Sequence, residues 1–308
     1  MAFDVSAYED YTNQESTDLI TRAQFTGILA ALPGINIQTG VKSKQQLKKF
    51  DTDVVLADGT SCGFSAAGND TFTKRDIETG AIRINKKWCL EDLEAKATQL
   101  LLSRGAQYDE SDLPGAIVDL IMKKIAKANA TSDWQNLTTD LYTGLATIIK
   151  GATGVVNGNV DNLTSMPTGT ALITALQKFI NKIPVEVYGE DDCGIFMGVD
   201  NFRELVTALV NANNFHFTGD GEAYKSKRLV FPGTDIVIYG DNGLNGTNEW
   251  YAFQESNIWM GVDMENDEEK FKIWFSDDDD EVKLKTRYRR GWQVGNPEEI
   301  TRFNLSGS

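Results

Sequence analysis

The sequence is poor in the residues that metal binding and redox chemistry use most often. Its 308 residues include one histidine and three widely separated cysteines, Cys62, Cys89 and Cys193. An odd number of scattered cysteines indicates free thiols, and it argues against a disulfide framework or a zinc knuckle. With a single histidine, the H-E-x-x-H zinc motif is excluded.

Positive charge is also scarce, since 30 Lys and Arg face 45 Asp and Glu, for a net charge of −15. This balance argues against binding nucleic acid through its phosphates, which requires clustered basic side chains. It favours a soluble protein that lies beside nucleic acid without adhering to it. No run of about 18 apolar residues occurs, so no membrane-spanning helix is predicted. Residues 1–18 lack the pattern of a signal peptide, and we expect synthesis in a cytoplasm.

Catalytic motifs are few and incomplete. Residues 59–63 fit the G-x-S-x-G pattern, but a nucleophile elbow needs a helix directly after it, and residues 64–69 have the composition of a loop. A cytosolic hydrolase that uses Ser61 or Cys62 of the Gly59–Gly63 segment, with His216 as base, is the alternative from another class. No P-loop or dinucleotide-binding glycine motif is present. We therefore predict a protein that is not an enzyme and has no cofactor.

Four consecutive aspartates form the one acidic cluster with room for a metal: Asp277, Asp278, Asp279 and Asp280. Their oxygens suit a hard cation, but such a charge run is more typical of a solvated turn between strands. We assign no metal site. If copies of the chain met around a symmetry axis, repulsion between these loops would require a cation or basic side chains. The candidates form a predicted charged sheet face: Lys283, Lys285, Arg287, Arg289 and Arg290.

The last fifth of the chain has the periodicity of an antiparallel sheet. Strand-like runs occur at residues 258–262, 270–275 and 281–288, with a weaker one at 299–303. In residues 281–288, apolar or neutral side chains alternate with charged ones, which predicts a half-buried strand with one wet face. We expect Gly291 to end this strand.

The rest of the chain mixes strand-like and helical stretches, which predicts an α+β protein. Residues 1–16 are expected to form an extended arm, and strands around a small-residue centre predict a protruding hairpin. The tip of that hairpin is expected at Asp58, Gly59, Gly63, Gly68 and Asn69. A buried strand is predicted at 194–198. Helices are predicted at 17–32, 90–104, 113–130, 170–181 and 199–211, within a helical region 86–150 and with Asp200 as the N-cap of the last helix.

This order of elements resembles the major capsid proteins of tailed double-stranded DNA bacteriophages, the Hong Kong 97-type capsid fold. Local likenesses are the long helix from Leu113, the segment Leu141-Tyr142-Thr143-Gly144-Leu145, and the strand from Gly194 that leads into a helix. Others are Ile258-Trp259-Met260-Gly261 and the ending with Trp292-Gln293-Val294 and Pro297.

The resemblance implies a domain plan. Residues 1–35 would form the N-terminal arm and short helix, and residues 36–85 an extended loop that lies over a neighbouring subunit. Residues 86–150 and 251–308 would form a peripheral domain with a spine helix and an antiparallel sheet. Residues 151–250 would form an α+β axial domain, and the aspartate turn would lie near three-fold contacts.

The resemblance also implies a function. The chain would be a viral structural protein that self-assembles as hexamers and pentamers into an icosahedral shell around packaged double-stranded DNA, without sequence-specific binding. Partners would be other copies, a portal and a separate scaffold protein, since no scaffolding segment precedes the arm. It would be assembled in the host cytoplasm and located in the virion capsid. A tail or adaptor protein of the virion is a further structural alternative.

Overall fold

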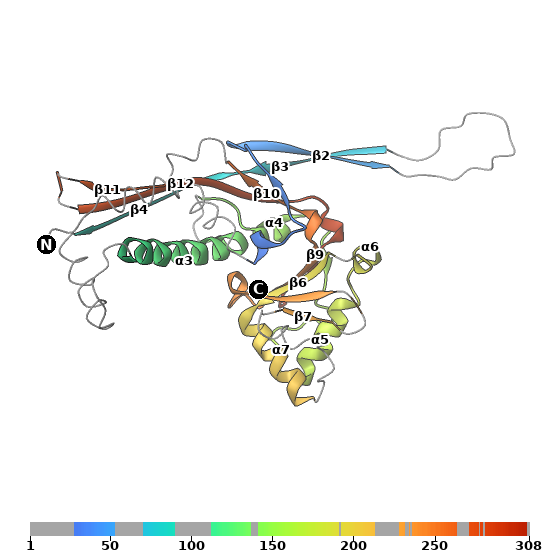
Figure 1. Cartoon of the computed structure of the whole chain (residues 1–308). Helices are drawn as coiled ribbons and strands as arrows, with labels where there is room; N and C mark the ends of the chain where they lie inside the picture. The colour runs from blue at the N-terminus through green and yellow to red at the C-terminus, as the bar shows by residue number, and fades with distance from the viewer. Residues whose placement is uncertain are drawn as a thin grey trace, which may run out of the picture.

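The structure is a computed structural model, and its described residues form three β-sheets and mix helix and sheet as the sequence predicted (Figure 1). One apolar core lies under a long upper sheet and reaches the junction with a lower body, and a second core lies inside that body. The described residues are 28–52, 70–89, 112–136, 141–190, 192–212, 228–231, 234, 236–263, 271–276, 278–279 and 281–306.

The upper sheet has five strands and is built around one long strand, β12 (Glu281–Val294). One edge of β12 pairs with β4 (Gly80–Cys89), and the other edge pairs with β10 (Ile258–Val262) and β11 (Phe271–Ser276). All three pairings are antiparallel, and β1 (Asn36–Gln38) adds a parallel strand beside β10. We call this five-stranded sheet the long sheet.

One face of the long sheet is buried against helix α3 (Asp112–Trp134), which runs beneath it (Figure 1). Along β12 the even positions from Val282 to Tyr288 are buried, and the odd positions are partly or fully exposed. Val282 and Tyr288 share an apolar core with Met122 and Ile125 of the helix. The predicted half-buried strand and long helix are therefore confirmed. None of the described helices, α3 included, is long and apolar enough to cross a membrane.

Two sequence predictions about this sheet are wrong. Gly291 does not end the strand, because it pairs with Gly261 inside the ladder between β12 and β10. A Cβ at position 291 would lie 2.0 Å from the carbonyl oxygen of Glu78, so glycine is needed there because another backbone segment passes close by. Residues 86–89, expected within a helical region, instead complete β4 and pair with residues 281–284.

A two-stranded hairpin projects from the long sheet, well beyond the body of the subunit (Figure 1). Its strands β2 (Lys44–Thr52) and β3 (Asp70–Glu78) pair antiparallel along their full lengths. The root is anchored, because Ile77 is fully buried and the Thr79 hydroxyl donates a 2.9 Å hydrogen bond to the Val41 carbonyl. The predicted hairpin is confirmed.

Several predicted features lie outside the described residues. These are the arm at 1–16, the helix at 90–104, the candidate hydrolase residues Ser61, Cys62 and His216, and the hairpin tip at Asp58, Gly59, Gly63, Gly68 and Asn69. Of the helix expected at 17–32, the described part holds the 3₁₀ turn η1 (Leu29–Ala31).

The lower body is built on a six-stranded sheet in the order β5-β13-β9-β6-β8-β7. Helices α5 (Thr170–Ile180) and α7 (Val199–Asn211) pack on its core as predicted, and β6 (Cys193–Gly198) is buried along its whole length. The remaining elements are α4 (Leu145–Gly151), β5 (Val156–Asn157), α6 (Val185–Tyr188), β7 (Arg228–Val230), β8 (Val237–Asp241), η4 (Asn242–Leu244), β9 (Trp250–Gln254), η5 (Glu255–Asn257), η7 (Pro297–Glu299) and β13 (Thr301–Phe303).

The lower body differs from the sequence prediction in two respects. Its sheet includes β9 and β13, so it extends beyond the range 151–250. Asp200 is not the N-cap of α7, because Gly198 occupies that position without a side-chain cap. The amide of Val199 is satisfied from another segment, since it donates a 2.7 Å hydrogen bond to the side-chain oxygen of Asn245.

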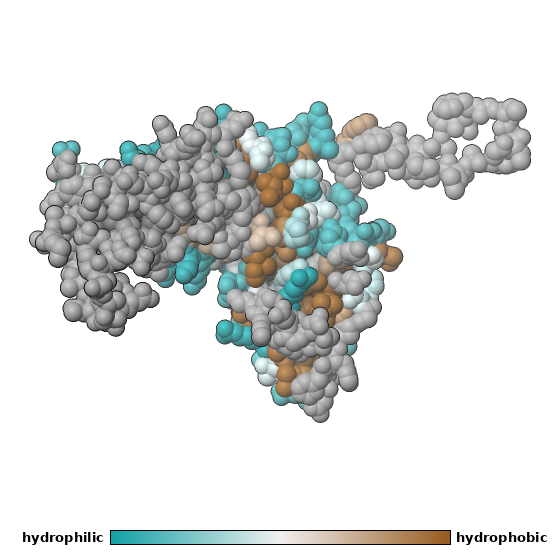
Figure 2. Space-filling view, in the orientation of Figure 1, coloured by the Kyte–Doolittle hydropathy of each residue, from teal (hydrophilic) through white to brown (hydrophobic). Residues whose placement is uncertain are grey.

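The end of α3 joins the long sheet to the lower body. Trp134 is fully buried there, donates a 2.9 Å hydrogen bond from its indole nitrogen to Asp241, and stacks on Tyr251 at 5.5 Å. Gln135 adds a 2.5 Å hydrogen bond to the carbonyl of Gly243. On the face drawn in Figure 2, hydrophobic residues gather where the upper sheet meets the lower body. The two parts are thus held together by apolar burial and by directional hydrogen bonds.

Candidate functional site

The open face of the long sheet concentrates positive charge, in a chain whose net charge is −15. Alternate side chains of β4, β11 and β12 point to this side, because successive residues of a strand point to opposite faces. We call the following residues the basic face: Arg83, Lys87, Lys272, Lys283, Lys285, Arg287 and Arg289.

The register of the sheet places charges of the same sign opposite one another. Lys285 of β12 is paired with Lys272 of β11, and Arg287 of β12 is paired with Arg83 of β4. Like charges at directly opposite positions destabilise a sheet. The stability of the subunit therefore does not explain why these basic side chains lie together on one face.

Part of this charge is neutralised within the chain, at two places. The first place is near the turn between β11 and β12. There Nζ of Lys87 lies 2.8 Å from Oε1 of Glu281, and Lys283 forms an ion pair with Asp279. The hydrogen bond to Glu281 raises the pKa of Lys87, and the one from Lys283 lowers the pKa of Asp279. The second place is Arg289, whose Nε atom lies 3.9 Å from Oδ2 of Asp263. In the part of the chain that the structure describes, the other four members have no acidic partner within ion-pair distance. They are Arg83, Lys272, Lys285 and Arg287.

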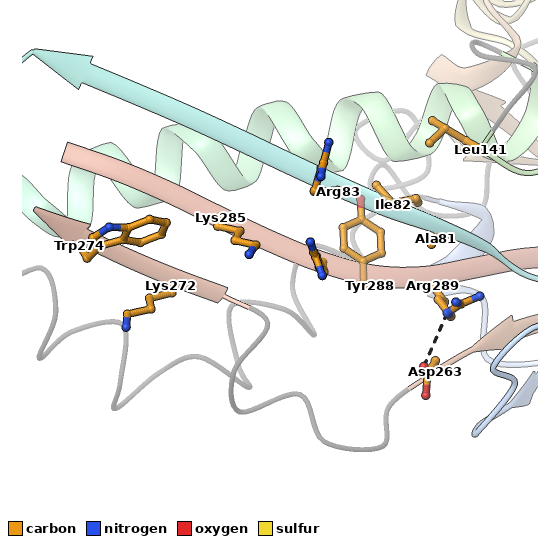
Figure 3. A pocket seen from close by; sticks show the side chains of 11 residues that line it. Ala81, Ile82, Arg83, Leu141, Asp263, Lys272, Trp274, Lys285, Tyr288 and Arg289 are labelled. Atoms are coloured by element: carbon orange, nitrogen blue, oxygen red, sulfur yellow. Dashed lines mark ion pairs between the residues drawn. The ribbon is translucent and has the colours of Figure 1, made fainter. Parts of the chain in front are cut away.

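A groove of about 970 Å³ runs along this face (Figure 3). Its lining includes Arg83, Lys272 and Lys285, and Figure 3 shows their side chains around it together with Trp274. The Lys272 ammonium lies 6.0 Å from the centre of the Trp274 ring. The groove thus offers basic groups beside an aromatic ring, which suits an acidic polymer.

The sequence predicted this face in part. Four residues of the predicted charged face lie on the basic face, namely Lys283, Lys285, Arg287 and Arg289, whereas Arg290 does not. Sequence reasoning missed Arg83, Lys87 and Lys272. A signal existed for Arg83, which alternates with the apolar Ile82 and Ile84, but only the pairing of the strands shows that it faces β12 side chains.

Two residues of the aspartate cluster lie in the turn between β11 and β12. Asp278 and Asp279 are both exposed there, whereas Asp277 and Asp280 lie outside the described residues. Within the described ranges no three His, Cys, Asp or Glu side chains come together in a way that could hold a metal ion.

Arg290 was predicted on the charged face, and this is wrong. It lies on the opposite face of β12 and is fully buried, because a shift of one residue reverses the direction of a strand side chain. Its Nη2 atom lies 2.5 Å from Oδ2 of Asp133, near the end of α3. The Trp292 indole and the Tyr142 hydroxyl each donate a 2.8 Å hydrogen bond to the other oxygen of Asp133. This buried network ties the helix to the long sheet.

A second buried carboxylate, Glu249, ties α4 to the lower sheet. Its oxygens lie 2.8 Å from Lys150 Nζ and 2.9 Å from Arg302 Nη2, and they accept a 2.5 Å hydrogen bond from Tyr251. Burial by itself raises the pKa of Glu249, but the donors from Lys150, Tyr251 and Arg302 outweigh it, so the pKa lies below its ordinary value.

The ionised form of Glu249 therefore contributes stability above the ordinary pKa of glutamate, and this contribution is lost as the pH falls through the lower pKa of the folded state. We expect Glu249→Gln to lower the free energy of unfolding at neutral pH by about 1–3 kcal/mol, and to flatten the acid side of the stability profile. Urea denaturation between neutral and acid pH measures both effects. Glu186→Gln, at an exposed position of α6, is the matched control; equal pH profiles for the two variants would contradict this role.

No model of a known protein family matches the sequence, and no curated protein sequence matches it either. Solved structures do match. A chain in the satellite phage P4 procapsid, whose structure includes the size determination (Sid) protein, has a TM-score of 0.58 at 13% identity, covering 99% of this chain and 92% of that chain. A chain of the capsid of an empty GTA particle has a TM-score of 0.57 at 13% identity, covering 93% and 90%. A chain of the capsid of Myoviridae phage XM1 has a TM-score of 0.53 at 14% identity, covering 88% and 89%.

The fold is therefore one found in phage capsid structures, over nearly the whole chain. The resemblance to the major capsid proteins of tailed bacteriophages, predicted from the order of elements, is confirmed at the level of the fold. At these identities the backbone arrangement is shared while most side chains differ.

Proposed function

We propose that this chain is a major capsid protein, which self-assembles as hexamers and pentamers into an icosahedral shell around packaged double-stranded DNA. The observation that carries the proposal is the likeness to a procapsid chain across 99% of this chain and 92% of that one. A likeness of this extent involves the hairpin, the long sheet and the lower body together, not a single common motif.

The shape of the subunit supports a role in assembly. An isolated two-stranded hairpin is marginally stable in water at best, yet β2 and β3 project from the body, and none of the other described strands lies beside their outer part. We infer that the hairpin, within the extended loop at residues 36–85, gains its stability by lying on a neighbouring subunit.

The proposed division into domains follows from the proposed capsid function. The peripheral domain would comprise α3 and the long sheet, from residues 86–150 and most of 251–308, and its sheet also takes β1 and most of β4 from residues 36–85. The axial domain comprises residues 151–250 together with β9 and β13, which complete its sheet, and it would meet its copies around the five- and six-fold axes. The turn at residues 277–280 would lie near three-fold contacts.

The partners in this proposal are other copies of the chain, a scaffold protein, a portal and the packaged DNA. The net charge of −15 would keep DNA from adhering to the shell while it is packed. Assembly would occur in the host cytoplasm, with the protein ending in the virion capsid and having no catalytic role.

Electron microscopy of the purified full-length chain, alone and with a co-expressed scaffold protein, tests the proposal. We expect capsomers or closed shells of uniform diameter, with a sedimentation coefficient far above that of a monomer. A strict monomer under all assembly conditions would overturn the capsid function. Small rings or tubes of low mass would instead favour a tail or adaptor protein.

A further inference from the structure

We propose that the basic face binds an acidic segment of a neighbouring copy of this chain, an inference that rests on the proposed function. The first reason is the register of the long sheet. It forces Lys272 against Lys285 and Arg83 against Arg287, and such like-charge pairs cost stability in the isolated subunit. A bound acidic segment would convert this repulsion into attraction at four positions of one surface.

The second reason is the position of the chain's own acidic side chains relative to the basic face. Asp279 and Glu281 neutralise Lys283 and Lys87 at the end of the sheet near the β11–β12 turn, and Asp263 lies beside Arg289. The middle of the face, with Arg83, Lys272, Lys285 and Arg287, receives no such partner from the described residues. These four side chains, which the described acidic residues leave without a partner, all line the groove drawn in Figure 3.

The third reason is the charge of the whole chain, which favours a second copy as the occupant. Two copies with a net charge of −15 each repel one another unless the contact places acidic groups of one against basic groups of the other. The basic face is a described surface that can provide those basic groups. A contact between two different surfaces of the same chain is heterologous, and such contacts generate closed rings when the rotation between copies closes.

The geometry favours an extended polypeptide. Side chains two residues apart on β12, such as Lys285 and Arg287, lie about 7 Å apart, and carboxylates at alternate positions of an extended segment have the same spacing. Among the described strands, the outer edges of β4 and β11 are also unpaired, so backbone groups are available beside the charged side chains. Phosphates of nucleic acid would also be attracted to the face, but the acidic remainder of the chain opposes them.

A charge reversal tests the proposal. Lys285→Glu with Arg287→Glu should lower the yield of shells or capsomers by about tenfold or more, because each attraction becomes a like-charge contact. The matched control is Lys123→Glu with Lys124→Glu, which makes the same change of charge at exposed positions of α3 and should assemble as the wild type does.

Zero-length carbodiimide crosslinking identifies the occupant directly. Assembled wild-type protein, prepared as an equal mixture of ¹⁴N- and ¹⁵N-labelled copies, should give mixed-isotope peptides that join Lys272 or Lys285 to an acidic residue. These peptides should be absent from the unassembled subunit. Should the reversal variant fail to fold, the milder Lys285→Gln with Arg287→Gln variant and the crosslinks on the wild type decide the question.

The outcomes separate this inference from the proposed function. If the wild type never assembles, both are overturned. If the wild type and the reversal variant assemble alike, or if crosslinks from Lys272 and Lys285 stay within one copy, only the inference is overturned. The inference is likewise overturned if the reversal leaves assembly intact but removes binding of labelled double-stranded DNA.

Discussion

Replacement of Arg290 by methionine is expected to lower the free energy of unfolding by about 3–5 kcal/mol, the usual cost of removing one partner of a buried ion pair. Arg290 and Asp133 are 0% and 1% exposed, and their atoms lie 2.5 Å apart. Methionine fills much of the space of the arginine stem, so the main loss is the charge. Asp133 would then keep its two hydrogen bonds from Trp292 and Tyr142 but would hold an uncompensated buried carboxylate.

The control lies on the same strand. Arg287→Met removes the same side chain from the exposed face of β12, and we expect it to change stability by no more than about 0.5 kcal/mol. Urea denaturation of the unassembled subunit measures both variants. A double variant with Asp133→Asn should be less destabilised than the sum of the single variants, because the two residues interact directly. Equal stability of the Arg290 and Arg287 variants would show that the buried pair contributes nothing.

Shortening the hairpin is expected to abolish shell formation while leaving the subunit folded. Lys49 and Thr73 are directly opposite one another in the β2–β3 ladder, so an Asn-Gly turn that replaces residues 50–72 preserves the register. The root, with the buried Ile77 and Thr79, remains. The part that is removed belongs to the projecting end, so its loss deprives a neighbouring subunit of a contact without opening the core.

Circular dichroism and denaturation should therefore match those of the wild type, whereas sedimentation and electron microscopy should detect subunits or capsomers in place of shells. The control replaces residues 53–69 by a flexible Gly-Ser segment of equal length, which keeps the length of the loop and removes its side chains. If that variant also fails to assemble, the side chains of the loop are needed in addition to its reach. Normal shells from the shortened hairpin would refute the role assigned to it.

Local sequence pattern was enough to predict the individual elements. Alternation in residues 281–288 predicted a half-buried strand, and the apolar stripe of residues 113–130 predicted the helix under it, because each signal arises from one segment facing one core. The helices at 170–181 and 199–211 were predicted for the same reason. The order of these elements was sufficient to indicate the capsid fold, although no family sequence model matches.

The sequence predictions are wrong or missing at positions whose role depends on a second segment of the chain. Gly291 was expected to end a strand, but it lies inside β12 because the carbonyl of Glu78 passes where its side chain would be. The strand β9 was not predicted, since a strand buried on both faces shows no alternation.

The sequence by itself determined the class of fold, the hairpin and the alternation of β12, because these follow from periodicity and composition within short segments. Only the tertiary structure decided what the charges do. The pairing of β4, β11 and β12 gathers Arg83, Lys272, Lys285 and Arg287 on one surface, and the packing of α3 turns Arg290 into a buried partner of Asp133. Electrostatic interactions depend on distance in space, and distances between segments far apart in the chain exist only once it has folded.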